Sequence, residues 1–230
     1  MIGKKITTIL SVVLFAGNGL YAVPVDKIFT SSGQILPGEE WENVFIHNDG
    51  TIVDMIGGDV DGIATYDASM VNVTGGHVNT LDALEFSTVN ISGGYVYGLF
   101  GKNQSIVTFS GLAAGRTFGV EDWAILTITG GVLDYLGAME QGTLNIRGGV
   151  VSDSLGAWDS ANVNIYGYGF TYDPSGGSAD GGQLRGFYLN GSSFILDLYG
   201  AQTYTHINLV PEPATLLLLG FGIFVLRQKR

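Results

Sequence analysis

The chain has 230 residues, of which 36 are glycine and none is cysteine, and its formal net charge at pH 7 is −11. Without cysteine this sequence holds no disulfide, no thiolate metal site and no thiol nucleophile. Frequent glycine beside plentiful valine, isoleucine, leucine and aromatic residues argues against disorder and favours short strands joined by tight turns.

The first residues are typical of a secretory signal peptide. Lys4 and Lys5 precede an apolar run at 6–16, and small residues follow up to Ala22. A basic region, an apolar region and small residues in this order are the layout of an export signal. The sequence therefore predicts export, with residues 1–22 removed by cleavage after Ala22. Leu20 is bulky for its place, so cleavage after Gly19 is the alternative.

A repeat of 18 or 19 residues fills the segment 49–167. Apolar residues alternate with a polar residue and are followed by Gly-Gly, with the clearest copies at 71–76, 89–94, 126–131 and 144–149. The leading glycines fall at 57, 75, 93, 111, 130, 148 and 167. Such a short alternating unit predicts a strand and a turn rather than a helical hairpin, and units of this kind bury their apolar residues only against one another.

We therefore expect an all-β fold, a parallel β-solenoid of about seven rungs with three short faces per rung. The extra residue of each 19-residue unit is predicted between the Gly-Gly pair and the last inward position, and these irregular units favour a right-handed β-helix over a strict hexapeptide one. Three inward columns are predicted: pairs such as Val71 and Val73; then Val60, Val78, Val96, Leu133 and Val151; then Ile63, Leu81, Leu99, Phe118, Leu136 and Leu155.

The two ends of a solenoid need covering, because a bare rung exposes unpaired strand edges. Residues 23–48, which include Trp41 and Phe45, are the expected N-terminal cap. Residues 168–210 are the expected C-terminal cap, since they break the repeat and contain strand-like segments at 184–189, 193–199 and 204–209.

An acidic column is the sharpest candidate for a metal site. It lies eight residues before each leading glycine, where like charges stacked at rung spacing would repel by about 3 kcal/mol per pair at an effective dielectric constant near 20. A hard cation such as Ca²⁺ would offset that repulsion. The other interpretation, favoured by residue type, is a row of exposed turn formers. The acidic members are Asp49, Asp67, Glu85, Asp122, Glu140 and Asp159, with Asn103 in the remaining unit.

No catalytic residue is predicted. Polysaccharide lyases and hydrolases on β-helices need acids that converge with a basic group, whereas Lys102, Arg116, Arg147 and His77 fall in different columns. We therefore expect a protein that is not an enzyme and that needs no cofactor, Ca²⁺ apart. Outward aromatic residues are instead candidates for stacking on sugar rings or for packing against a partner: Tyr66, Tyr95, Tyr97, Phe100, Trp123 and Trp158.

The C-terminal segment 211–230 joins Pro211, Glu212 and Pro213 to an apolar stretch and the basic residues Arg227, Lys229 and Arg230. As a short helix, the stretch at 214–226 would reach about 20 Å, less than the ~30 Å hydrocarbon core of a bilayer. The pattern resembles the PEP-CTERM sorting signal of Gram-negative bacteria. This resemblance implies that exosortase, a membrane-embedded cysteine transpeptidase, recognises and removes the tail. A simple tail anchor is the alternative.

Removing both terminal segments leaves five basic and twenty acidic residues, a net charge of −15. That charge disfavours nucleic acid and anionic lipid, and it favours cations or neutral partners such as sugars. Sorting signals of this kind are associated with exopolysaccharide and biofilm formation. We therefore expect an exported structural or adhesive protein of the cell surface or extracellular matrix, held transiently at the inner membrane. The alternatives are a carbohydrate-active β-helix enzyme and a carbohydrate- or Ca²⁺-binding module.

Overall fold

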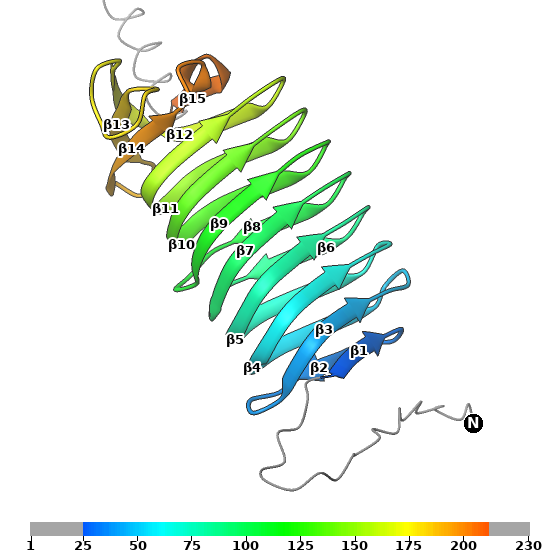
Figure 1. Ribbon diagram of the computed structural model, residues 1–230. Helices are drawn as coiled ribbons and strands as arrows, with labels where there is room; N and C mark the ends of the chain where they lie inside the picture. The colour runs from blue at the N-terminus through cyan, green and yellow to red at the C-terminus, as the bar shows by residue number, and fades with distance from the viewer. Residues whose placement is uncertain (1–24, 212–230) are drawn as a thin grey trace, which may run out of the picture.

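The computed structural model describes residues 25–211, which form a rod of about eight stacked turns of parallel strands (Figure 1). The predicted all-β solenoid is confirmed. The predicted signal peptide and C-terminal helix lie outside the described residues. In chain order the elements are β1 (Val25–Phe29), β2 (Gly33–Ile35), β3 (Glu40–Ile46), β4 (Ile52–Thr65), β5 (Met70–Ala83), β6 (Thr88–Ile91), β7 (Tyr95–Gly101), β8 (Ile106–Phe109), β9 (Ala114–Val120), β10 (Ile125–Ala138), β11 (Thr143–Ala157), β12 (Asn162–Asp173), β13 (Gln183–Tyr188), β14 (Ser193–Tyr199), the 3₁₀ helix η1 (Thr203–His206) and β15 (Ile207–Pro211).

Each turn follows the repeat. In β5, Val71 and Val73 point into the core, the chain bends at a pair of glycines, and Val78 points inward again beyond them. The second glycine, Gly76, has a φ of +84°, and a Cβ atom there would lie 2.6 Å from the carbonyl oxygen of Gly58 in the neighbouring turn. Only glycine combines this backbone conformation with so close an approach. All three predicted inward columns are buried.

A further inward column, which the repeat analysis missed, lines the narrow edge of the rod. Its members are small or polar in most turns, so they do not form an apolar column in the sequence. Thr65 shows how a polar member is satisfied, because its hydroxyl lies within hydrogen-bonding distance of the Asp82 carbonyl oxygen at 3.2 Å and of Ser87 Oγ at 2.9 Å. The column comprises Ile46, Thr65, Ala83, Gly101, Val120, Ala138 and Ala157.

The longer units absorb their extra residue where the spacing predicts. Phe109 pairs with Ile128 and Ala114 with Val132, so one extra residue lies at 110–113, where Leu112 is 95% exposed. A second lies at 152–153, because the pairing of β10 with β11 shifts by one residue there. Both extra residues fall between the glycine corner and the third predicted inward column, which contains Phe118 and Leu155, so they leave that column in place.

The N-terminal end is itself a turn of the solenoid. Strand β2 pairs with β4 in parallel, as does β3, so the segment 33–46 adds one turn to the seven that the glycine template marks. Strand β1 pairs with β3 and lies at the end of the rod. The ammonium group of Lys27 lies 4.4 Å from the ring centroid of Trp41 and 3.5 Å from a carboxylate oxygen of Glu39.

The C-terminal end is closed by an antiparallel cap. Strand β13 pairs antiparallel with β12 on one side and with β14 on the other. Strand β14 also pairs in parallel with β11, and β15 pairs in parallel with β12. Leu184, Tyr188 and Phe194 are buried and cover the end of the solenoid core. The strand-like segments at 184–189 and 193–199 match β13 and β14. Tyr204 belongs to η1, and the last strand begins only at Ile207.

Candidate functional site

The acidic column lies at the corner between one turn and the next, and it forms a continuous row that we call the carboxylate ladder. Its residues share an unusual backbone conformation, with φ between +54° and +58°. In the first turn this conformation belongs to Asn48, and Asp49 follows it. Asp and Asn tolerate this region better than most side chains, which accounts for four of the six residues but not for Glu85 and Glu140. The residues with this conformation are Asp67, Glu85, Asn103, Asp122, Glu140 and Asp159.

Side chains of the carboxylate ladder hydrogen-bond to the backbone of the preceding turn. A carboxylate oxygen of Asp67 accepts the N–H of Asn48 at 2.8 Å, and one of Glu85 accepts the N–H of Asp67 at 2.8 Å. Asn103 accepts from Glu85 at 3.1 Å with its amide oxygen. These bonds satisfy backbone donors at the corner, which gives the polar side chains a structural role without a ligand.

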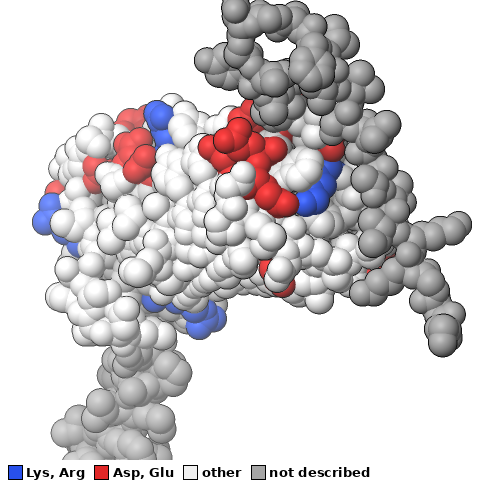
Figure 2. All heavy atoms as spheres, turned by 90° about the horizontal axis from the view of Figure 1, so that it is seen from below, with Lys and Arg blue, Asp and Glu red and all other residues white. Residues whose placement is uncertain are grey.

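A neighbouring carboxylate also shifts the pKa of one ladder side chain. The hydrogen bond between Glu140 and Asp122, together with the negative charge of Asp122, raises the pKa of Glu140. Among residues 25–211, no group of three or more His, Cys, Asp or Glu side chains is arranged to hold a metal ion. Ca²⁺ binding at Asp49 and the carboxylate ladder therefore stays a prediction. In the view of Figure 2, acidic side chains gather in a few groups and much of the remaining surface is uncharged.

The predicted outward aromatic residues do not form one platform. The ring of Tyr66 stacks on His47 at 4.5 Å between centroids, and Tyr95 stacks on His77 at 5.5 Å. Trp123 lies one residue beyond the ladder residue Asp122, three turns away from Tyr66, which lies one residue before the ladder residue Asp67. Most of these rings therefore have separate surroundings, and only Trp158 belongs to a larger cluster.

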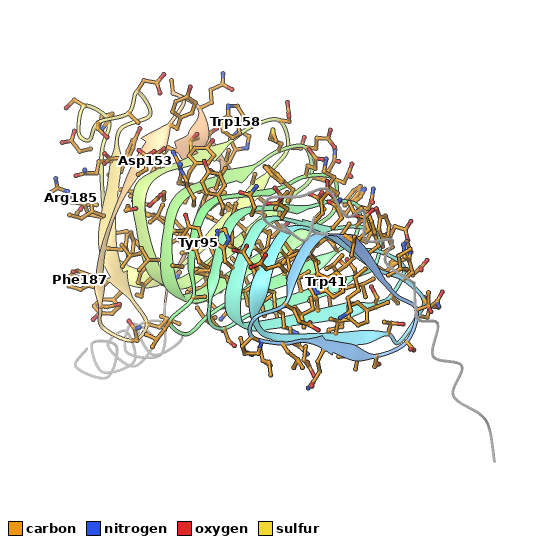
Figure 3. The ribbon with its side chains drawn as sticks, turned by 60° about the horizontal axis from the view of Figure 1, so that its bottom comes forward. Trp41, Tyr95, Asp153, Trp158, Arg185 and Phe187 are labelled. Atoms are coloured by element: carbon orange, nitrogen blue, oxygen red, sulfur yellow. The ribbon has the colours of Figure 1, made fainter. Side chains whose placement is uncertain are left out.

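That cluster borders an open cleft of about 440 Å³ where the rod meets its C-terminal cap. The ring of Tyr199 lies edge-on to Tyr135 at 6.5 Å and to Trp158 at 6.1 Å between centroids. Figure 3 shows Asp153 and Trp158 toward the capped end of the rod. We call this site the aromatic cleft; it is lined by Tyr135, Asp153, Ser154, Ser178, Ala179, Asp180 and Tyr199, with Trp158 packed behind Tyr199.

Local sequence features make room for these rings. Gly137 and Gly156 occupy an outward column that carries Phe100 and Asp82 in earlier turns. A Cβ atom at Gly137 would lie 3.3 Å from the ring of Tyr135 and 3.6 Å from that of Trp158. The two rings therefore lie against bare backbone on one side and contact Tyr199 on another.

The opposite wall of the aromatic cleft is a loop at 174–182 that Asp197 holds in place. The carboxylate of Asp197 accepts hydrogen bonds from Gln183 Nε2 at 2.6 Å, from Ser178 Oγ at 2.6 Å and from the Ser178 N–H at 2.8 Å. These hydrogen bonds lower the pKa of Asp197. Asp180 in turn accepts the N–H of Gly200 at 2.7 Å, so the loop is tied at Ser178 to β14 and at Asp180 to the residue that follows β14.

The electrostatics of the aromatic cleft suit an uncharged polar ligand. Burial raises the pKa of Tyr135, and the neighbouring Tyr199 and Asp153 raise it further, so its phenol stays neutral at physiological pH. The lining residues include two carboxylates, two serine hydroxyls and no basic group. Trp158 was predictable from the sequence as an outward aromatic residue. Tyr135, Asp153 and Tyr199 were not predicted, because they come from separate turns and from the cap.

The C-terminal strand joins the rod directly to the sorting signal. Pro211 ends β15 and pairs with Gly167 of β12, while Glu212, Pro213, Arg227, Lys229 and Arg230 lie outside the described residues. Within residues 25–211, no helix has the length and apolar character that crossing a bilayer requires. The fold and this connection define a β-solenoid with a C-terminal extension.

The extension matches the family model of the PEP-CTERM protein-sorting motif over residues 209–230. The resemblance seen in the sequence is thereby confirmed, and the motif implies an exported protein whose C-terminal sorting signal is recognised by exosortase. Searches of curated proteins and of solved structures gave no match.

Proposed function

We propose that this protein is a structural or adhesive component of the cell surface or extracellular matrix, and that it binds exopolysaccharide through the aromatic cleft. The sorting motif supports delivery to that location, and the cleft supports the choice of ligand. The β-solenoid is a rigid rod that carries both features at its capped end, because every turn is paired through its backbone with the turns beside it.

The aromatic cleft carries this proposal because its groups match the chemistry of a sugar. Aromatic faces pack against the apolar C–H face of a sugar ring, while carboxylates and hydroxyls exchange hydrogen bonds with the sugar hydroxyls. Its volume lies within the range of small-ligand sites. Asp153 and Asp180 would repel an acidic glycan, so we propose a neutral or amino-sugar polysaccharide as the ligand.

A carbohydrate-active enzyme is the second candidate, since Asp153 and Asp180 both line the aromatic cleft. A glycosidase needs one carboxylic acid kept protonated by an apolar setting and a second that stays ionised. Both aspartates are exposed, and Asp180 is engaged by a backbone N–H group. This arrangement favours binding over hydrolysis.

Calorimetric titration of the native protein with oligosaccharides cut from the host's exopolysaccharide tests the proposal. Tyr199 is 53% exposed, so Tyr199→Ala should leave the fold intact and weaken binding about tenfold, the loss of one central aromatic contact. Tyr97→Ala is the matched control, because Tyr97 is 41% exposed on β7, two turns away from Tyr135. Equal affinities in all three proteins, or no binding by any, would rule out the aromatic cleft as the glycan site.

Processing is tested by the intact mass of the protein from cell surface and medium, in hosts with and without exosortase. We expect a chain that ends near Pro211 to Pro213 only where the enzyme is present. A full-length chain in both hosts would make the tail a plain anchor and remove the main support for a matrix role.

A further inference from the structure

The capped end of the rod is held close to the membrane by a short linker. Pro211 is fixed to β12 by strand pairing, and only Glu212 and Pro213 separate it from Ala214, where the apolar stretch of the sorting signal begins. Three residues span at most about 11 Å even when fully extended. While the apolar stretch is anchored in the bilayer, the end of the rod must therefore lie in or next to the headgroup layer, which is about 5–8 Å thick.

The surface presented at this end is apolar. Along β13, Leu184 and Tyr188 are buried against the core, so the alternate residues Arg185 and Phe187 face outward, and Figure 3 shows both at the C-terminal end of the rod. The ring of Phe187 stacks on that of Tyr168, with 5.4 Å between centroids. We call this surface the end face; its exposed members are Tyr168, Arg185, Phe187, Leu189 and Ile195.

The end face adjoins the point where the sorting signal leaves. Gly167 pairs with Pro211 on one side and with Tyr188 on the other. Phe187 is therefore only two strand spacings, about 10 Å, from Pro211. A tether that brings Pro211 to the headgroup layer brings Phe187 and its stacking partner Tyr168 there too.

Two of the basic residues lie toward the capped end of the rod, in a protein whose net charge otherwise disfavours anionic lipid. Five lysines and arginines occur in residues 25–211, and Lys27 and Lys102 form ion pairs with acidic side chains. Arg185 lies in the end face, close enough to the carboxylates of Asp173 and Asp197 to help lower their pKa values. The guanidinium of Arg147 lies 3.8 Å from the ring centroid of Tyr166, whose strand neighbour is Val210. Arginine beside exposed aromatic rings is the composition that proteins present to the membrane–water interface.

We propose that the end face rests in the headgroup layer of the inner membrane for as long as the sorting signal is anchored, and that it holds Pro211 at the membrane surface for exosortase. A lipid surface is favoured over a protein partner, because the tether keeps the end face at the bilayer whether or not the enzyme is present. The proposal rests on membrane anchoring of the signal and is independent of glycan binding.

Single cysteines report the contact directly, since the chain has none of its own. The full chain carrying Phe187→Cys or Ile195→Cys is labelled with a small fluorophore and reconstituted in phosphatidylethanolamine–phosphatidylglycerol vesicles that contain headgroup-nitroxide lipid. Tyr97→Cys, on an outward position in the middle of the rod, is the control. We expect at least twofold quenching at 187 and 195 and none at 97. No quenching at 187 and 195, or equal quenching at all three positions, overturns the proposal.

A charge substitution separates lipid from enzyme as the occupant. Ile195 is 56% exposed, so Ile195→Glu should fold normally, which an unchanged melting temperature verifies. We expect it to reduce quenching of a label at 187 and to slow tail removal in the exosortase host, with Tyr97→Glu changing neither. Slower tail removal with unchanged quenching would mean that the end face docks on exosortase, and the lipid proposal would be wrong.

Discussion

Replacing Asp122 tests whether the carboxylate ladder serves the backbone or a cation. A carboxylate oxygen of Asp122 accepts the Asn103 N–H at 2.9 Å and the Asn103 side-chain amide at 3.2 Å. Asn103 performs the same task toward Glu85 with a neutral amide. Asp122→Asn should therefore keep the structural role and remove the charge, whereas Asp122→Ala removes both.

The expected magnitudes follow from these contacts. In Asp122→Ala the backbone N–H of Asn103 loses its acceptor, which costs about 1 kcal/mol. Alanine also tolerates a φ of +54° less well than Asp or Asn, at about 1 kcal/mol more. We expect a total loss near 2 kcal/mol in the free energy of unfolding. Asp122→Asn should match or exceed the wild type, because it removes the charge that raises the pKa of Glu140.

Urea denaturation at pH 7 and low salt, with and without millimolar Ca²⁺, measures these differences. If Asp122→Asn lost as much free energy of unfolding as Asp122→Ala, the structural role of the ladder would be refuted. A wild type that Ca²⁺ stabilises, with the gain lost in Asp122→Asn, would show that the ladder binds the cation. The raised pKa of Glu140 also predicts the direction of the pH dependence. Because the folded state binds this proton more tightly than the unfolded state, the wild-type free energy of unfolding should increase as the pH falls toward that pKa. Asp122→Asn should lack this increase.

Three further predictions concern the backbone, the cap and the core. Gly94→Ala combines a φ of +75° with a Cβ only 2.7 Å from the Gly76 carbonyl oxygen, so it should lose more than about 2 kcal/mol in urea denaturation. Gly38→Ala, at a φ of +85° with open space around it, should lose only about 1 kcal/mol, and equal losses would contradict the steric argument. Hydrogen bonds lower the pKa of Asp197, so its stabilisation is present above the ordinary value of 3.8 and is lost as the pH falls through the lowered pKa. Melting temperatures between pH 5 and 2 should show this loss in the wild type and not in Asp197→Asn. Leu99→Ala should lose about 2–5 kcal/mol, and a loss below 1 kcal/mol would mean that the turns repack around the cavity.

The solenoid was predictable because its core follows a strict alternation around the glycine corners. The turn at 33–46 escaped notice, because Pro37-Gly38 stands where the later turns have Gly-Gly. The inward column of Thr65 and Ala83 escaped for a different reason: its residues fit a narrow edge and show no common apolar character. In both cases burial is decided by pairing with the next turn, which composition does not encode.

The carboxylate ladder shows where sequence reasoning reaches its limit. The spacing of its residues predicted a stack, and their types indicated a turn. Their hydrogen-bond partners depend on how far each turn is shifted along the chain relative to the next, as in the bond from the Asp67 N–H to Glu85. The aromatic cleft was less accessible still, because Tyr199 meets Tyr135 only after the cap folds back and β14 pairs with β11.

A regular repeat presents the same surface on every turn, so a distinct site has to arise where the repeat is broken. The extra residue at 152–153 places Asp153 at the rim of the aromatic cleft, and the cap strand β14 adds Tyr199 beside it. Tyr199 ends β14, whereas Ile195 of the end face lies four residues earlier, about 13 Å away along the strand. Because both side chains point outward from β14, glycan capture at the aromatic cleft and membrane contact at the end face use neighbouring parts of the same strand.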